Sequence, residues 1–228
     1  MPTSYESLLP EILPMVAGCP DSLAESSIRS AVIEFCEKSG AYQAQLDPIT
    51  TIAKAYEYDL EAPNGTAVHK IMWASHLGKD LEPMSTTLLE QREPKWREED
   101  RFSTPKYFIK QSPSVFWLVP VPSEKKASST IVRVQLKPTH TSTACDDEVM
   151  SDYRDTIVNG ALFRLLRIPN KDWSDLSGAQ VYGAAFIEGV RNAERRAKHA
   201  DEGVARKVNY GGLPQRTRHA KRGWRTSY

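Results

Sequence analysis

Cysteine is scarce in this chain of 228 residues, and long hydrophobic runs are absent. The three cysteines, Cys19, Cys36 and Cys145, are too few and too scattered for a disulfide framework. An odd cysteine count in a chain without an export signal fits a reducing compartment. No apolar run approaches the ~18 residues of a transmembrane helix, so we expect no membrane span. The N-terminal segment lacks basic residues and carries Glu6 and Glu11, so we do not expect a signal peptide.

Sequence signatures of catalysis are also missing. The chain has no Gly-x-Ser-x-Gly motif, and the adjacent Gly211 and Gly212 are not followed by a helical pattern that could hold a phosphate. The nearest approach to a metal-binding spacing is His140 with Cys145 and Asp146, which we interpret as a polar surface cluster. We therefore predict no catalytic residue, no cofactor and no metal, and we expect that the chain is not an enzyme.

Isolated titratable residues have structural interpretations. His69 and His76 lie seven apart in a predicted strand and turn, so we expect them on opposite faces. The acidic run 98–100 beside Trp96 could form a glycosidase-like acid pair, but a solvated loop is favoured. Cys36 lies on an apolar helix face, which is typical of a small core residue.

Positive charge is concentrated at one end of the chain. The net charge is +1, but 11 lysines and arginines face only three acidic residues from Arg191 onward. The preceding 190 residues therefore carry a net charge of −7. A basic end indicates an acidic protein or a nucleic acid as partner, and a solvated, disordered end is the alternative in the isolated protein.

Helical periodicity dominates both ends of the sequence. Ser4 is a candidate N-cap for a first short helix, and a second helix is predicted from Asp21 or Ser22 to Ser39, with Gly40 ending it. After residue 146, an apolar stripe predicts one helix to about residue 168 and a second from near residue 174 to about residue 200.

The middle of the chain, residues 46–137, is β-rich. A hairpin is predicted between segments 49–60 and 68–74, joined by the turn 63–65. A short strand near residue 81 precedes a predicted loop over residues 90–105. Three more strands are predicted at 106–110, 115–119 and 130–136. Pro120 and Pro122 imply that the second of these lies at a sheet edge or ends there.

These segments predict an α+β fold. It has N-terminal helices, a small antiparallel β-sheet or sandwich in the middle, a C-terminal helix pair and an extended basic tail. We predict one domain over residues 1–212, with helices in 5–39 and 147–200 around the β-rich insertion. Residues 213–228 are predicted to be a tail that orders on a partner.

The five tryptophans fall into two groups. Trp73 and Trp117 lie in predicted strands and Trp173 at a helix–helix corner, so we expect these three in cores. Trp96 and Trp224 lie among polar and basic residues, which favours a role as interface anchors.

Basic and aromatic residues alternate in the tail. These residues are Arg216, Arg218, Lys221, Arg222, Trp224, Arg225 and Tyr228. They could bind nucleic-acid phosphates and stack on bases. They could equally enter an acidic protein groove through arginine–carboxylate pairs and aromatic anchors.

Several packing motifs, taken in order, resemble bacteriophage head-to-tail adaptor proteins, including the tail-tubular-protein type of short-tailed phages. The resemblance spans about residues 5–210. The motifs are Leu8-Leu9-Pro10, Gly18-Cys19-Pro20, Phe35-Cys36, Asp47-Pro48-Ile49, Tyr58-Asp59-Leu60, Pro63-Asn64-Gly65-Thr66, Pro105-Lys106-Tyr107, Trp117-Leu118, Pro120-Val121-Pro122, the stretch 133–138 and, most specifically, 153–169 with Trp173 and 179–193.

The resemblance implies a structural virion protein. Such adaptors form a ring, commonly of twelve copies, that joins the portal to the tail or nozzle protein and leaves a channel for genomic DNA. The implied location is the neck of the virion, assembled in the host cytoplasm without a membrane partner. It also implies that the C-terminal segment binds the portal. The alternative is a nucleic-acid-binding protein that uses the basic tail.

Overall fold

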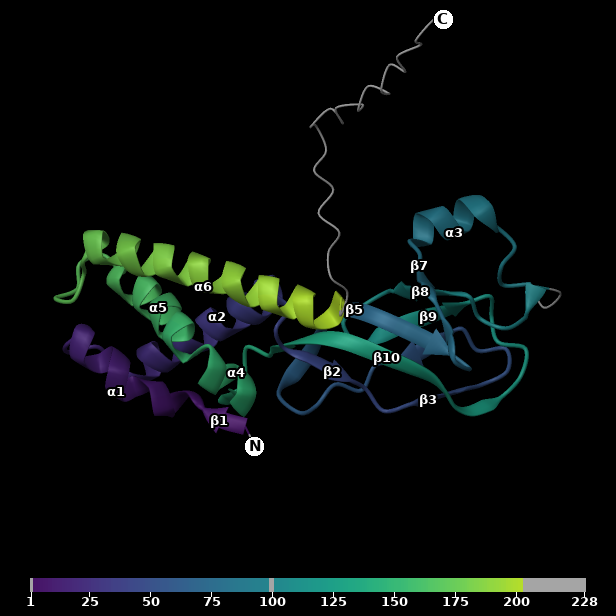
Figure 1. Cartoon of the computed structure of the whole chain (residues 1–228), viewed down its shortest axis with the longest axis horizontal. Helices are drawn as coiled ribbons and strands as arrows, with labels where there is room; N and C mark the ends of the chain where they lie inside the picture. The colour runs from purple at the N-terminus through teal and green to yellow at the C-terminus, as the bar shows by residue number, and fades with distance from the viewer. Residues whose placement is uncertain (1, 99–100, 203–228) are drawn as a thin grey trace, which may run out of the picture.

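Helices gather at one end of an elongated molecule and two β-sheets at the other (Figure 1). The computed structural model describes residues 2–98 and 101–202. The arrangement confirms the predicted α+β class. The helices of this part are η1 (Tyr5–Leu8), α1 (Leu9–Ile12), η2 (Leu13–Met15), α2 (Asp21–Ser39), α3 (Thr86–Arg92), α4 (Asp147–Asp152), α5 (Arg154–Leu166) and α6 (Leu176–Glu202).

The strands of the described residues form three sheets. A two-stranded pair joins β1 to β11, a five-stranded sheet has the order β2-β10-β5-β6 with β3 also on β10, and a four-stranded sheet has the order β4-β9-β8-β7. The strands are β1 (Pro2–Ser4), β2 (Gln43–Gln45), β3 (Ile49–Thr51), β4 (Glu57–Asp59), β5 (Thr66–His76), β6 (Lys79–Asp80), β7 (Glu82–Pro83), β8 (Tyr107–Lys110), β9 (Val115–Val119), β10 (Lys126–Pro138) and β11 (Ala144–Asp146).

Helix α2 follows the sequence prediction except at its start. It ends at Gly40, whose φ of 65° is the left-handed conformation that glycine adopts without a steric penalty. The N-cap is Pro20 and not Asp21 or Ser22, because the Pro20 carbonyl already accepts from the N–H groups of Leu23 and Ala24 at 3.0 and 3.1 Å. Asp21 instead lies in the first turn, where a carboxylate complements the helix dipole.

The single helix predicted after residue 146 is two helices, so that prediction is wrong at Tyr153. This residue leaves helical geometry at φ −118°, between α4 and α5. Its ring packs on Phe35 of α2 with centroids 4.7 Å apart. The neighbouring Arg154 donates to the Glu11 carboxylate and to the Ser7 carbonyl. Tertiary contacts with the N-terminal helices therefore accompany the break between α4 and α5.

Helices α5 and α6 approach closely through glycine. A Cβ added at Gly160 of α5 would lie 2.7 Å from the Phe186 ring of α6, and one at Gly183 of α6 would lie 2.7 Å from the Phe163 ring of α5. Each helix therefore inserts a phenylalanine against a glycine of the other. The helical core around this contact combines α2, α5 and α6 with Tyr5 and Leu8 near the N-terminus.

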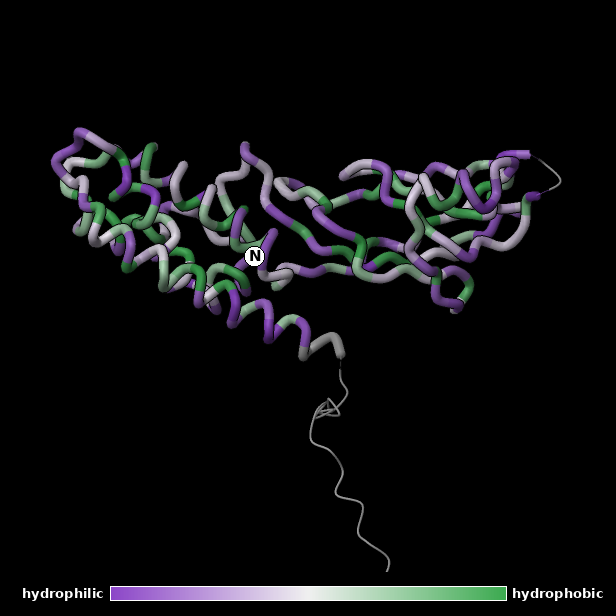
Figure 2. Tube along the Cα trace, turned by 90° about the horizontal axis from the view of Figure 1, so that it is seen from above, coloured by the Kyte–Doolittle hydropathy of each residue, from purple (hydrophilic) through white to green (hydrophobic). Residues whose placement is uncertain are grey.

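The two larger sheets stack face to face, so the middle of the chain is the predicted sandwich. Val132, Val134 and Leu136 of β10 are fully buried and pack with Phe116 and Leu118 of β9. Figure 2 colours hydrophobic residues green, and green stretches run through the β-rich part of the molecule.

The predicted hairpin between residues 49–60 and 68–74 is wrong. The turn forms, because the Thr66 N–H donates to the Pro63 carbonyl at 3.0 Å, but its flanking strands enter different sheets. Tyr58 of β4 pairs with Phe116 of β9, and Ala74 of β5 pairs with Val132 of β10. Alternation of apolar residues sets the face of a strand and does not set its partner.

A third layer covers the outer face of the four-stranded sheet. Strand β9 ends at Val119 as predicted but lies between β4 and β8, so it is not an edge strand. Its Trp117 and Val119 face away from the sandwich and pack beneath α3 and Trp96. Helix α3 begins at Thr86, ahead of the predicted loop, and the Ser85 hydroxyl caps it at the Leu88 N–H.

Candidate interaction surfaces

Helix α6 is the longest element and runs along one edge of the helical part (Figure 1). The Asp175 carboxylate accepts from the Ser177 N–H at 3.0 Å and caps its first turn. Three large apolar side chains in its first half face solvent: Leu176 at 66% exposure, Val181 at 68% and Ile187 at 50%. They lie five and six positions apart and therefore spread over a broad exposed side of the helix. A partner protein could cover them together with the hollow at the tip that Val181 lines.

The second half of α6 is basic and exposed. Arg195 donates to the Asn192 side chain at 2.8 Å, and Lys198 pairs with Glu194 at 2.6 Å. Within the described residues, neither Arg191 nor Arg196 forms an ion pair with a carboxylate. Apart from the exposed Glu188, the large exposed side chains of α6 therefore change from apolar to cationic along its length.

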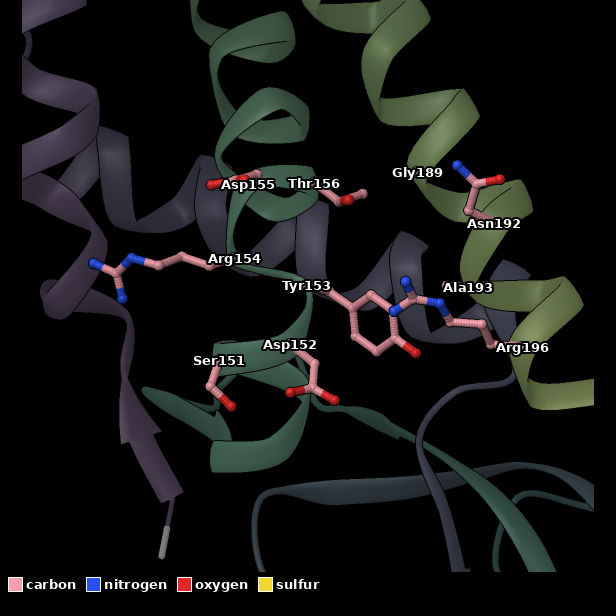
Figure 3. A pocket seen from close by; sticks show the side chains of 10 residues that line it. All are labelled: Ser151, Asp152, Tyr153, Arg154, Asp155, Thr156, Gly189, Asn192, Ala193 and Arg196. Carbon is pink, nitrogen blue, oxygen red and sulfur yellow. The ribbon is translucent and has the colours of Figure 1, made fainter. Parts of the chain in front are cut away.

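A groove of about 370 Å³ lies between the α4–α5 junction and α6 (Figure 3). Figure 3 shows Tyr153 and Arg196 pointing toward each other across it, with Asp152 at its rim. Its lining mixes both signs of charge and contains no buried ionisable group. Its residues are Ser151, Asp152, Tyr153, Arg154, Asp155, Thr156, Gly189, Asn192, Ala193 and Arg196.

A second hollow, of about 420 Å³, lies at the tip of the helical part. Met15, Val181 and Tyr182 line it together with Trp173. Trp173 is only partly buried against the helical core, and its indole Nε1 is a buried donor without a hydrogen-bond partner among the described residues. The exposed apolar surface of α6 thus continues onto the tip.

Hydrogen bonds fix the helical part to the sandwich. The buried Gln135 of β10 donates from Nε2 to the Cys36 and Glu37 carbonyls of α2, at 2.7 and 3.0 Å. Lys137 of β10 pairs with the Glu37 carboxylate at 2.6 Å. The two Gln135 contacts supply hydrogen bonds to carbonyls at the C-terminal end of α2, where the Cys36 carbonyl also accepts from the Gly40 N–H at 3.3 Å.

The predicted surface cluster around His140 does not form. Cys145 is buried, and the interaction of its thiol with that of Cys36 raises the pKa of Cys36 and lowers that of Cys145. Asp146 caps α4 by accepting from the Glu148 N–H at 3.0 Å. In the described part of the chain, no three histidine, cysteine or acidic side chains gather as a metal site.

The two histidines predicted in a strand and turn, His69 and His76, both lie in β5. His76 is buried and its Nδ1 lies 2.9 Å from the Thr130 hydroxyl, and burial lowers its pKa. His69 is half-buried on the same strand, and burial also lowers its pKa.

The expectation that Trp96 is an exposed anchor is wrong. Trp96 is 3% exposed, with its ring centroid 5.1 Å from that of Tyr56 and 5.8 Å from that of Trp117. The Arg97 guanidinium covers this cluster, 4.7 Å from the Trp96 ring. The acidic run beside it lies partly outside the described residues.

The predicted portal-binding residues of the tail all lie outside the described residues. No helix among residues 2–98 and 101–202 has the length and apolarity needed to cross a bilayer.

The fold and its surfaces define an α+β protein whose open grooves and exposed helix face are suited to contacts with other proteins. A protein-family model described as the SU10 adaptor protein matches residues 5–208, which is most of the chain. The chain therefore belongs to the SU10 adaptor protein family. It is a bacteriophage adaptor, a structural component of the virion that interacts with other virion proteins. No curated protein matches the chain.

Proposed function

We propose that this adaptor forms a ring that joins the portal vertex to the tail and leaves a channel through which the genome passes. The family match over residues 5–208 carries the proposal. The ring is proposed to hold twelve copies in the virion neck, between the portal and a tail or nozzle protein. It is assembled in the host cytoplasm and performs no catalysis. The narrower likeness to tail-tubular proteins of short-tailed phages stays a prediction.

The charge distribution supports a channel that does not bind DNA tightly. DNA must slide through the ring, so the lumen cannot hold a dense cluster of lysine and arginine that neutralises phosphates. The first 190 residues carry a net negative charge, which is compatible with such a lumen.

The C-terminal segment is proposed to bind the portal. Its cationic and aromatic side chains suit an acidic groove, through charge-assisted hydrogen bonds and buried aromatic anchors. A segment that orders only on the portal loses conformational entropy there, which delays tight association until the portal is present.

The direct test is to mix the purified chain with the portal of the same virion and image the complex by negative-stain electron microscopy. We expect a ring stacked on the portal. A chain that stays monomeric beside an unchanged portal would contradict the proposal.

A second experiment examines the tail alone. Removing residues 213–228 should abolish portal binding in a pull-down, while a chain with Lys79→Glu and Lys125→Glu, both exposed in the β-rich part, should still bind. Unchanged binding by the truncated chain would show that the tail is not the anchor. Salt-dependent binding of duplex DNA by the full chain, lost on truncation, would favour the nucleic-acid alternative.

A further inference from the structure

The two long edges of the helical part carry complementary surfaces. Along one edge lies the exposed face of α6, which is apolar at Leu176, Val181 and Ile187 and cationic at Arg191 and Arg195, with the exposed Glu188 between the two halves. We call this face the α6 edge. The apolar half lies toward the free tip of the helical part and the cationic half toward the sandwich (Figure 1).

The opposite edge is formed by α1, η1 and α4 (Figure 1). Pro10 and Pro14 are exposed on the N-terminal helices, beside the half-buried Leu9 and Leu13. The exposed Glu11 in the same stretch is paired with Arg154 of α5. Nearer the sandwich, every charged side chain of η1 and α4 is acidic and exposed. We call this surface the acidic edge, and its carboxylates are Glu6, Asp147 and Glu148, since Asp152 lines the groove that α4 shares with α6.

The order of properties is the same on both edges. Each runs from apolar near the tip to charged near the sandwich, and the charges have opposite sign. Two copies placed side by side in the same orientation therefore bring apolar against apolar and cation against carboxylate. A two-fold contact between two α6 edges brings cations together when the helices are parallel, and cations against apolar side chains when they are antiparallel.

We propose that the α6 edge of one copy binds the acidic edge of the next copy. The contact is heterologous, because each copy uses two different surfaces, and a closing rotation turns such a contact into a ring. The inference rests on the proposed ring function and names the interface that builds it. Complementary charge fixes the register, and the apolar side chains supply buried area.

Charge reversal on each edge tests the contact. The variant Arg191→Glu/Arg195→Glu gives a copy with two negative edges. The variant Asp147→Lys/Glu148→Lys leaves only Glu6 on the acidic edge and gives a copy with two positive edges. Self-association is measured by sedimentation velocity up to millimolar concentration and, with the portal added, by native mass spectrometry. Lys79→Glu/Lys125→Glu is the control with the same charge change as the first variant.

We expect each variant alone to associate at least about tenfold more weakly than the parent chain, since like charges then repel across the interface. An equimolar mixture of the two should recover association, because negative and positive copies can alternate. The control should associate like the parent.

A second pair of variants keeps the test independent of the folding of the charge-reversed chains. Val181→Asp should weaken self-association, while Ile52→Asp, at a similarly exposed site of the β-rich part, should not. Unchanged association in all α6 and α4 variants, or no recovery on mixing, would overturn the interface. Portal binding that persists in that case leaves the proposed function intact. A parent chain with no self-association, alone or on the portal, also overturns the interface.

Discussion

At the scale of single residues, Trp96 attaches the outer layer of the sandwich. Its ring packs against Tyr56 and Trp117 and lies beneath the Arg97 guanidinium. Trp96→Ala should lower the free energy of unfolding by about 3–5 kcal/mol, the cost of removing a buried large aromatic side chain. Urea unfolding followed by circular dichroism measures the change. Leu88→Ala, on the more exposed face of α3, is the control and should cost much less. Equal losses in the two variants would contradict this assignment.

Glu34 is the residue at which we expect a pH effect on stability. Burial would raise its pKa, but hydrogen bonds and charge from Lys38 and Arg164 lower it overall. A carboxyl group with a depressed folded pKa stabilises the fold above its unfolded pKa of about 4.5 and loses that contribution as pH falls through the folded value.

The parent chain should therefore be more stable than Glu34→Gln at pH 7, and the difference should shrink below about pH 4.5. Thermal unfolding of both chains between pH 3 and pH 7 measures this difference. A difference that stays constant across the range would show that the carboxylate charge does not matter. Glu25→Gln, at a half-buried position of the same helix, controls for loss of helix charge.

The burial of a residue was predicted correctly where its neighbours in the sequence are also apolar, and wrongly where those neighbours are polar or charged. Cys36 lies between apolar residues of α2 and is buried, as expected. Trp96 has only polar and charged neighbours, which stay in solvent while its own side chain alone enters the layer. Nothing local in the sequence distinguishes that arrangement from an exposed anchor, because the partners Tyr56 and Trp117 are distant in the chain.

At the scale of elements, the glycines of α5 and α6 control the closest helix contact. A Cβ at Gly160 would lie 2.7 Å from Phe186 and 3.0 Å from the Cβ of Ala31, and both neighbours are buried. Overpacking at such a site costs about 1–3 kcal/mol, more than the gain of up to about 1 kcal/mol in helix propensity.

Gly160→Ala should therefore lower the unfolding midpoint in urea. Gly183→Ala should have a smaller effect, since the facing Phe163 is half-buried and can move toward solvent. Equal or reversed effects of the two substitutions would contradict the packing described here.

Sequence patterns identified most elements and misassigned their connections. The bounds of β9 and the end of α2 follow from local apolar runs and a stopping glycine. The pairing of β4 with β9 and of β5 with β10 depends on contacts between distant segments, and a turn at residues 63–66 gave no sign that its flanks separate. The break at Tyr153 likewise depends on Phe35, far away in the sequence.

At the scale of the whole molecule, the chain presents an exposed apolar and cationic helix face on one edge and an acidic surface on the other. The sequence predicted a bacteriophage adaptor, which the family match confirms, while the narrower tail-tubular type stays a prediction. The α6 edge was not predicted. The apolar stripe of a helix indicates which residues are buried, but it does not show which of the helix's other apolar residues are exposed to solvent. Leu176, Val181 and Ile187 are identified by their exposure in the fold.

The central claim is that copies of this chain assemble into a ring on the portal. Native mass spectrometry of the reconstituted complex counts adaptor copies for each portal assembly. We predict one discrete, saturated species with twelve adaptor chains, formed at the expense of free monomer. A broad distribution of partly loaded portals, or a single adaptor that binds without neighbours, would contradict the account.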